Sequence, residues 1–351
     1  MFDSIISKEN LLLAWREFLK GKKKKLDVQV FQYNLLDNIE KLHQDLKNKV
    51  YFHRGYTHFN ISDPKPRNIS KASVRDRLLH HAIYRVLYPY FDSKFIHDSY
   101  SCRKWKGTHR AIDRFRELSR KVSQNNTKQC WVLKYDVRKF FASIDHQTIK
   151  NMLKWYGLDQ DTLWLLDRVI DSFHTPIHIS VMTDICKGLP LGNLTSQLLV
   201  NIYMNEFDQY VKHRLKVRYY IRYADDFVIL SRNKSELNNL LQYTVINLKE
   251  HLKLNLHPNK ISIKTLSSGV DFLGWVHFPH HRVLRTTTKR RMFKKLSNNS
   301  KPESVQSYFG MLKHGNAHKL QNVIIKLSDL DVIHEAGKKQ AFPYRNSTPF
   351  T

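Results

Sequence analysis

The stretch that most constrains this chain is YYIRYADDFVILSRN, residues 219–233, in which two adjacent aspartates separate two runs rich in β-branched and aromatic residues. Apolar runs on both sides of a short polar segment predict an antiparallel β-hairpin. Because Asp is a common turn residue, a polar turn is the simplest interpretation of Asp225 and Asp226. The alternative is a metal site at the tip of a buried hairpin, which requires a further carboxylate from elsewhere in the chain.

The segment WVLKYDVRKFF, residues 131–141, supplies that carboxylate: Asp136 ends an apolar, strand-like run and precedes a turn. Neighbouring residues on a regular strand point to opposite faces, so we expect one of Asp225 and Asp226 to face Asp136 unless the turn redirects both. Carboxylates brought together repel, and a hard, oxygen-binding cation offsets the repulsion. Two Mg²⁺ ions about 3.5–4 Å apart can activate an attacking hydroxyl and neutralise a leaving pyrophosphate. The pattern therefore indicates nucleotidyl transfer.

The charge balance indicates a polyanionic partner. There are 59 Lys and Arg residues against 31 Asp and Glu, a net charge of +28, which suits nucleic acid or an anionic membrane surface.

No run of 18 apolar residues and no signal-peptide pattern at the N-terminus appear in the sequence, so we expect neither a membrane-spanning nor a secreted protein. Three cysteines without paired spacing fit a reducing cytoplasm. A chain of 351 residues, 41% of them hydrophobic, predicts a globular fold with several subdomains.

The 19 histidines form neither an HExxH motif nor a Cys/His cluster in the sequence. The tandem pairs His80-His81 and His280-His281 are expected at the surface or in contact with nucleic acid, because adjacent residues cannot share one helix face.

The remaining pattern alternates helices and strands, which predicts an α+β or α/β fold with an antiparallel hairpin in its sheet. A helix that begins near residue 74 is expected to end at Pro89. Asp145 is expected to cap the helix after the first strand. The other expected elements are helices over 8–21, 30–49, 160–173 and 234–252, a long helix after residue 193, strands over 260–265 and 270–278, and a basic helical segment over 285–330.

Ordered sequence blocks over nearly the whole chain resemble those of bacterial and group II intron-type reverse transcriptases. In chain order the blocks are KPRNIS with VRDRLLHHAI, YSCRKWKGTHRAI, YDVRKFFASID, YADD, LHPNKI, FLGW and SYFGMLKHGNAHKL. The resemblance implies an α+β right-hand polymerase with fingers, a palm containing an antiparallel sheet, and a helical thumb. The expected boundaries are 1–130 for N-terminal helices and fingers, 131–278 for the palm with an insertion at 158–190, 279–335 for a basic thumb, and 336–351 for a tail.

One block departs from most of that family. Where most members have Q-G-x-x-x-S-P, this chain reads LGNLTSQ, with Leu191 in place of the glutamine and Gln197 in place of the proline. An aliphatic-G-x-x-x-S-Q block resembles the reverse transcriptases of diversity-generating retroelements, which copy a template RNA into adenine-mutagenised cDNA. A leucine removes a hydrogen-bonding restraint near the nucleotide, and sites that hydrogen-bond their substrate discriminate better than apolar ones. The resemblance thus implies low fidelity.

The resemblance also assigns roles to individual residues. The implied catalytic residues are Asp136, Asp225 and Asp226, with Asp136, Asp225 and the backbone carbonyl of Val137 as metal ligands. The implied nucleotide-binding residues are Lys65, Arg67, Phe141, Leu191, Gly192, Gln197 and Lys260. The implied primer and template contacts are Arg77, Tyr223, Phe272, Leu273, Gly274, Trp275, Lys289, Arg290 and Arg291.

Several of these assignments have a plainer alternative. Phe141 matches a steric gate that excludes the 2′-OH of ribonucleotides, and its alternative is a core aromatic residue beside Phe140. Arg67 could lie in a solvated turn, Gln197 could be an ordinary helix residue, and Lys260 a surface lysine. Arg77 could contact the template or pair with Asp76.

As a whole, the resemblance implies an RNA-directed DNA polymerase that requires two Mg²⁺ ions, with Mn²⁺ as a possible substitute. Its implied partners are template RNA, cDNA primer and product, dNTPs and a small basic oligomeric accessory protein, without a membrane. The expected location is the cytoplasm of a bacterium or archaeon, or of a phage-infected cell. The rival functions are a group II intron-like or retron-like reverse transcriptase in mobility or defence, and a non-catalytic RNA-binding scaffold.

Overall fold

The computed structural model describes residues 1–62, 66–175, 186–298 and 302–325. The chain divides into two compact units: unit 1 comprises Met1–Ala111 and Leu133–Ile263, and unit 2 comprises Ile112–Val132 and Lys264–Thr351. Lys65, residues 176–185 of the expected insertion, residues 326–335 of the expected thumb, and the tail lie outside the described residues. The expected boundaries of fingers, palm and thumb stay predictions.

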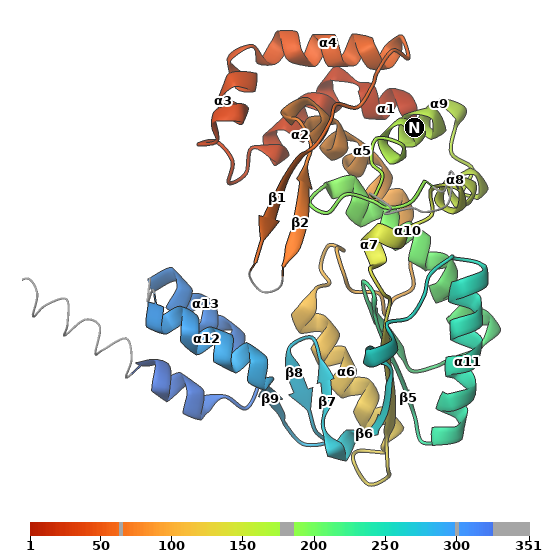
Figure 1. The fold of residues 1–351 in the computed structure, drawn as a ribbon, viewed down its shortest axis with the longest axis vertical. Coiled ribbons are helices and arrows are strands. Elements are labelled where there is room, and N and C mark those ends of the chain that lie inside the picture. The colour runs from red at the N-terminus through yellow and green to blue at the C-terminus, as the bar shows by residue number, and fades with distance from the viewer. Residues whose placement is uncertain (63–65, 176–185, 299–301, 326–351) are drawn as a thin grey trace, which may run out of the picture. The chain divides into compact units, whose positions relative to one another are not determined.

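Unit 1 begins with a group of helices and one two-stranded antiparallel sheet (Figure 1). These elements are α1 (Phe2–Ile6), α2 (Lys8–Phe18), α3 (Leu26–Tyr33), α4 (Leu35–Lys47), β1 (Thr57–Ile61), β2 (Arg67–Lys71) and α5 (Val74–Asp92). Helix α5 packs against α1, α2 and α3. The helix expected over 30–49 is instead two helices, because the backbone at Asn34 leaves the helical region with φ −112° and ψ 44°.

Two expectations for α5 were wrong. The helix does not end at Pro89 but continues to Asp92. Proline in the last turn removes only one intrahelical hydrogen bond, and the continued turn buries the ring of Phe91 completely. His80 is not at the surface: it is 1% exposed, and its ring stacks on that of His53 with centroids 5.2 Å apart.

The central sheet of unit 1 has the strand order β4-β5-β3-β6. Its strands are β3 (Trp131–Asp136), β4 (Tyr220–Tyr223), β5 (Asp226–Ser231) and β6 (Ser262–Thr265). Residues 131–132 of β3 and 264–265 of β6 are assigned to unit 2. Strands β4 and β5 form the predicted antiparallel hairpin, with Tyr223 opposite Asp226. The connecting turn is Ala224-Asp225, and Ala224 has a positive φ of 55°. Burial of β5 is nearly complete, in agreement with its apolar sequence.

The other helical elements of unit 1 are α7 (Phe140–Ser143), α8 (His146–Trp155), α9 (Gln160–Ile170), α10 (Leu194–Gln209), a π-helical turn at Tyr210–Arg214, and α11 (Lys234–Glu250). Helix α11 lies along β5, and α10 packs against α5 and α8. Asp145 caps α8 as predicted, because its Oδ1 accepts the backbone N–H of Thr148 at 2.9 Å.

Unit 2 contains a three-stranded antiparallel sheet of β7 (Val270–Phe272), β8 (Trp275–His277) and β9 (Arg282–Leu284). The single strand expected over 270–278 is therefore a hairpin. Leu273 and Gly274 form its two-residue turn with φ values of 50° and 87°, the combination that such tight hairpins require.

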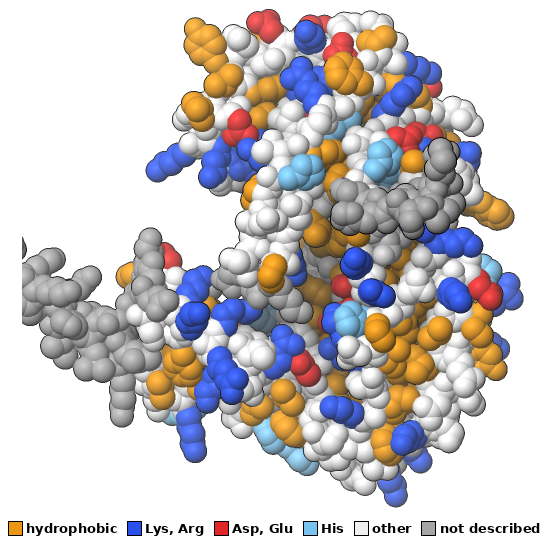
Figure 2. All heavy atoms as spheres, viewed as in Figure 1, with side chains coloured by type: hydrophobic (Ala, Val, Ile, Leu, Met, Phe, Trp, Pro, Cys, Tyr) orange, Lys and Arg blue, Asp and Glu red, His pale blue; other side chains and the backbone are white. Residues whose placement is uncertain are grey.

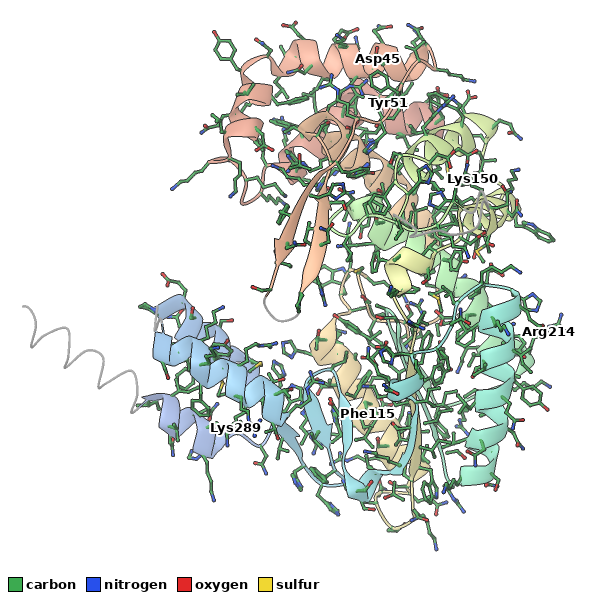
Figure 3. All side chains as sticks on the ribbon, viewed as in Figure 1. Asp45, Tyr51, Phe115, Lys150, Arg214 and Lys289 are labelled. Atoms are coloured by element: carbon green, nitrogen blue, oxygen red, sulfur yellow. The ribbon has the colours of Figure 1, made fainter. Side chains whose placement is uncertain are left out.

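Unit 2 also contains most of α6 (Thr108–Val122), together with α12 (Thr286–Asn298) and α13 (Pro302–Leu312). Phe115 on α6, labelled in Figure 3, packs against the ring of Phe272 with centroids 5.5 Å apart. None of the described helices is both long and apolar enough to cross a bilayer.

Candidate catalytic site

The three aspartates singled out from the sequence lie at the same end of two neighbouring strands. Asp136 is the last residue of β3, Asp225 lies in the β4–β5 turn, and Asp226 is the first residue of β5. The backbone N–H of Val137 donates to the carbonyl oxygen of Asp225 at 3.3 Å, which ties the end of β3 to the turn. Backbone geometry thus brings together residues that are about 90 positions apart in the sequence.

The pKa values of Asp225 and Asp226 are raised, as expected for buried carboxylates that lie close together. Burial, followed by the nearby charge of Asp136, raises the pKa of Asp225 to about 6. Burial also raises the pKa of Asp226, against the opposing effect of Lys134, whose Nζ lies 3.3 Å from Asp226 Oδ1. Removing carboxylates from water and placing them beside one another both disfavour the charged form. A bound cation would reverse that preference.

Lys260 provides a positive charge at Asp136. Its Nζ donates to Asp136 Oδ1 at 2.7 Å, and the lysine side chain is 43% exposed. Its position follows from the preceding chain: the N–H of His257 donates to the carbonyl of Asp136 at 2.8 Å, and the 3₁₀ turn Pro258–Lys260 follows directly. The block LHPNKI therefore runs beside the end of β3 and places Lys260 at the carboxylates.

The donor atoms present suit a hard divalent cation. The site offers carboxylate oxygens from Asp136, Asp225 and Asp226, and carboxylates are the oxygen donors that Mg²⁺ and Mn²⁺ bind. The raised pKa of Asp225 means that metal binding must displace a proton at acidic pH but not at neutral pH.

A buried ion pair supports the turn that carries Asp225. Arg222, on β4, is 1% exposed, and its guanidinium donates to both carboxylate oxygens of Asp208 at 2.7–2.9 Å. Its Nη1 also donates to the carbonyl of Ala224 at 3.3 Å, and its Nη2 to the hydroxyl of Ser99 at 3.1 Å. Asn201 Oδ1 accepts a further bond from Nη1. This network joins the turn to α10 and to the segment that precedes α6.

A second set of predicted residues lines one cavity in unit 1. The cavity, of about 580 Å³, is bordered by Phe141, Leu189 and Leu191, together with aromatic and polar side chains of the β1–β2 sheet and of the segment after α9. The N–H of Ser70 on β2 donates to the carbonyl of Leu191 at 3.0 Å, and that of Leu189 to the carbonyl of Phe141 at 2.8 Å. Phe141 and Leu191, expected to contact the nucleotide, therefore share one wall.

The other described residues expected to bind the nucleotide near Leu191 are Gly192, Gln197 and Arg67. Gly192 has φ +113°, and a Cβ atom there would lie 2.9 Å from the Cγ2 of Ile69, so glycine is favoured for two reasons. Gln197 lies in the first turn of α10 and is partly exposed. Arg67 is the exposed first residue of β2.

Arg77 and Tyr223, expected at the primer and template, have partners of other kinds. The Nη2 of Arg77 lies 2.7 Å from Oδ2 of Asp27, and its guanidinium packs over the ring of Phe18. The predicted alternative, a pair with Asp76, was wrong, because the Asp76 carboxylate instead accepts the hydroxyls of Ser73, the N-cap of α5, and of Tyr51. The hydroxyl of Tyr223 lies 3.0 Å from that of Thr108.

The remaining expected primer and template residues lie in unit 2. Phe272 and Trp275 are buried on either side of the tight turn formed by Leu273 and Gly274. Lys289, Arg290 and Arg291 are exposed on α12, and Figure 3 labels Lys289 there. Figure 2 shows Lys and Arg side chains gathered over this helix.

Three contributors to the site were missed in the sequence. Lys134 lies two positions before Asp136, so strand alternation could have placed both on one face. Asp208 is a fully buried acid within the apolar helix α10, and such an acid requires a buried partner. No local signal marks the third, Asn201.

Comparison with known proteins agrees with this geometry. The reverse transcriptase (RNA-dependent DNA polymerase) family profile matches residues 61–277. Protein YkfC of Escherichia coli is 26% identical over 261 residues, which cover 65% of this chain and 66% of YkfC. The group II intron-encoded protein LtrA of Lactococcus lactis is 21% identical over 320 residues, covering 73% of this chain and 51% of LtrA. The matched regions thus span less than two thirds of either relative.

A solved structure of apo telomerase from Candida tropicalis matches with a TM-score of 0.50 and 11% identity, over 66% of this chain and 48% of that one. This likeness concerns the fold alone and confirms the predicted α+β right-hand polymerase. Since the family profile covers well over half of the sequence and includes all three aspartates, the chain belongs to the reverse transcriptase (RNA-dependent DNA polymerase) family.

Proposed function

We propose that this protein is an RNA-directed DNA polymerase that adds dNTPs to a primer 3′-OH on an RNA template. The observation that carries the proposal is the meeting of Asp136, Asp225 and Asp226 at one end of the sheet, with raised pKa values at the last two. A purely structural turn has no need of three acids whose charges oppose one another.

In the proposed reaction, the 3′ oxygen of the primer forms a bond to the α-phosphorus of a dNTP, the bond from that phosphorus to the β-phosphate oxygen breaks, and pyrophosphate leaves. Two Mg²⁺ ions held by Asp136, Asp225 and the carbonyl of Val137 would favour loss of the hydroxyl proton and neutralise the leaving group. Asp226 would support the arrangement through its pair with Lys134.

Other residues would bind and select the nucleotide. Arg67 and Lys260 suit the triphosphate oxygens, because charged donors make the strongest hydrogen bonds to phosphate. Lys65 would share this role. Phe141, at the wall of the cavity next to Leu189, would exclude a 2′-OH. Gly192 and Gln197 would complete the pocket next to Leu191.

The primer and template would lie against basic and aromatic residues. Exposed Lys289, Arg290 and Arg291 suit the phosphate backbone, which such contacts bind without reading sequence. Arg77 and Tyr223 would contact the template side, and the Phe272–Trp275 turn would hold the primer end. Template RNA, cDNA and dNTPs are the proposed substrates.

We further propose that the enzyme is the error-prone polymerase of a diversity-generating retroelement and works with a small basic oligomeric partner in the cytoplasm. Leu191 supports this: an apolar side chain borders the cavity that Phe141 shares, where a glutamine would offer a hydrogen-bonding amide. The rival is a group II intron-type enzyme, which the likeness to LtrA favours.

Primer extension on an RNA template with dNTPs and Mg²⁺, followed by sequencing of the products, tests both proposals. We expect cDNA with errors concentrated opposite template adenines, and fewer such errors from Leu191→Gln. An even, low error rate in the wild type would remove the diversity-generating assignment and leave the polymerase. RNA binding without any cDNA, even with the basic partner and the cognate template RNA present, would favour the RNA-binding scaffold.

A further inference from the structure

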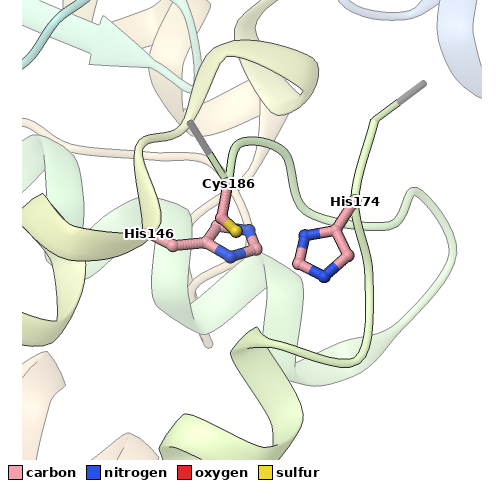
Figure 4. A group of neighbouring side chains, drawn as sticks. All are labelled: His146, His174 and Cys186. Atoms are coloured by element: carbon pink, nitrogen blue, oxygen red, sulfur yellow. The ribbon is translucent and has the colours of Figure 1, made fainter. Parts of the chain in front are cut away.

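Three side chains capable of binding a metal ion meet in unit 1 outside the carboxylate group. His146 begins α8, His174 follows α9, and Cys186 lies shortly before Leu189. One potential ligand atom from each lies within 4.8 Å of the other two, and Figure 4 shows the three side chains directed toward a common point. No local sequence pattern indicates this group, because the three residues are separated by 28 and 12 positions.

His146 is oriented as a metal ligand. Its side chain is 3% exposed, and its Nε2 lies 2.7 Å from the carbonyl oxygen of Gly188, to which it donates. The lone pair of the neutral ring is therefore on Nδ1. This Nδ1 is buried and accepts no hydrogen bond from the described residues. A backbone acceptor on the opposite nitrogen is the usual support of a metal-binding histidine.

The other two ligands are held close by backbone hydrogen bonds. The N–H of His146 donates to the carbonyl of Cys186 at 3.1 Å, and the N–H of Thr175 donates to the carbonyl of Lys187 at 2.9 Å. The residues next to His174 and Cys186 are thus paired with each other beside the start of α8. Both side chains are exposed, and the ring of His174 lies against that of His146 with centroids 5.5 Å apart.

We propose that His146 Nδ1, His174 and the thiolate of Cys186 bind one Zn²⁺ ion, with water as the fourth ligand. Two imidazoles and a thiolate form the borderline-soft donor set that Zn²⁺ prefers. Tetrahedral coordination places such donors roughly 3.3–3.6 Å apart, so the three ligand atoms, which lie within 4.8 Å of one another, would come closer together on binding. Loss of the thiol proton accompanies binding.

The charges around this group suit such an ion. Asp171 Oδ1 lies 3.7 Å from Nδ1 of His146, and Asp171 Oδ2 lies 2.7 Å from Nζ of Lys150. The carboxylate of Asp171 offsets the positive charge of Lys150, so that the lysine does not repel the ion at full strength.

The proposed ion would hold the wall of the cavity that contains Phe141. Two residues after Cys186, Gly188 donates to the carbonyl of Ile144 at 2.8 Å, and Leu189 then donates to Phe141. A metal that anchors Cys186 to α8 would therefore fix the segment that forms this wall. This inference does not depend on the proposed polymerase activity, because the ligand set is separate from Asp136, Asp225 and Asp226.

The test is a titration of the purified, reduced, full-length protein with Co²⁺ as a spectroscopic substitute for Zn²⁺, in excess Mg²⁺ to occupy the carboxylates. We expect a sulfur-to-cobalt charge-transfer band, tetrahedral visible absorption, and displacement by one equivalent of Zn²⁺. Cys186→Ser should abolish the charge-transfer band, and His174→Gln should weaken Co²⁺ binding at least about tenfold, the range seen when ligand support is lost.

Matched controls separate this site from general thiol and imidazole binding. Cys102→Ser removes the other exposed cysteine, and His251→Gln removes an exposed histidine elsewhere; both should keep the wild-type spectrum. Zn²⁺ should also raise the Tm of the wild type and of Cys102→Ser, but not that of Cys186→Ser, since only a native-state ligand stabilises the fold. The absence of a charge-transfer band in the wild type, or its retention in Cys186→Ser, would overturn the proposal.

Discussion

The guanidinium of Arg222 and the carboxylate of Asp208 form a fully buried ion pair, with Nη2 2.7 Å from Oδ2 and Nε within 2.9 Å of both oxygens. Tyr220 donates to the same carboxylate at 2.7 Å. Because Arg222 also reaches the carbonyl of Ala224, this pair determines where the turn that carries Asp225 lies.

Removing one partner should therefore cost stability. Asp208→Asn leaves the Arg222 charge buried without a counter-charge, and such changes cost about 3–5 kcal/mol. Urea unfolding monitored by circular dichroism measures the loss. The control is Glu117→Gln, which breaks exposed pairs with Arg114 and Lys121 and should cost at most about 1 kcal/mol. Equal costs for the two variants would contradict the structural role of the buried pair.

Asp225 makes stability depend on pH in a defined direction. Its pKa is raised from 3.8 to about 6 in the folded protein, so the folded state holds a proton that the unfolded state releases. Without divalent metal, this carboxyl lowers stability as pH rises from about 4 to 6, and the full loss persists above pH 6. Asp225→Asn should therefore be more stable than the wild type at pH 7.5, by at most about 3 kcal/mol.

The difference between the two proteins should become small near pH 4, close to the ordinary pKa of 3.8, and should disappear at lower pH, where Asp225 is protonated in both states. Thermal unfolding in EDTA at pH 4 and pH 7.5 measures it. An Asp225→Asn variant that is less stable than the wild type at pH 7.5 would show that this carboxyl does not carry an unfavourable charge.

Lys260 competes with metal for Asp136. Because its Nζ bonds Asp136 Oδ1, Lys260→Ala should tighten Mn²⁺ binding in the absence of nucleotide, as measured by electron paramagnetic resonance. If Lys260 also holds the triphosphate, the same variant should raise the KM for dNTPs with less effect on kcat. Lys264→Ala, an exposed lysine on β6, is the control and should change neither. Unchanged Mn²⁺ affinity in Lys260→Ala would contradict the competition.

Phe141 can be tested as the residue that selects deoxyribonucleotides. Phe141→Ala should increase incorporation of rNTPs relative to dNTPs at least about tenfold, which corresponds to about 1.4 kcal/mol of lost discrimination. Phe173→Ala removes another aromatic ring from the same cavity and should leave the ratio near that of the wild type. Similar ratios for both variants would mean that Phe141 is only a packing residue.

Much of the site could be predicted from the sequence because its parts are local patterns. The doubled aspartate between apolar runs predicted the β4–β5 hairpin, and the apolar run before Asp136 predicted a strand that ends at this carboxylate. Asp145 could be recognised as a cap because capping depends on a few neighbouring residues. The block LGNLTSQ pointed to a nucleotide pocket, and the structure places Leu191 beside the cavity that Phe141 lines.

What could not be predicted depends on contacts between distant segments. The partner of Arg77 is Asp27, fifty residues earlier, and nothing in the local sequence selects it over Asp76. Helix α5 continues beyond Pro89 to Asp92, because burial of the Phe91 ring offsets the one intrahelical hydrogen bond that proline cannot donate. The turn within 270–278 depends on a positive φ at Leu273, a conformation that leucine seldom adopts.

The measurement that tests the central claim most directly is single-turnover addition of one dNTP to a primer annealed to RNA, with Mg²⁺, for the wild type, Asp136→Asn and Asp225→Asn. Asp161→Asn, which changes an exposed aspartate outside the site, is the control. We predict that the first two variants lose about 10³-fold in rate, as expected when several kcal/mol of metal-assisted charge stabilisation is removed, while Asp161→Asn retains the wild-type rate. Wild-type rates in Asp136→Asn and Asp225→Asn would contradict the assignment of this carboxylate group as the catalytic centre.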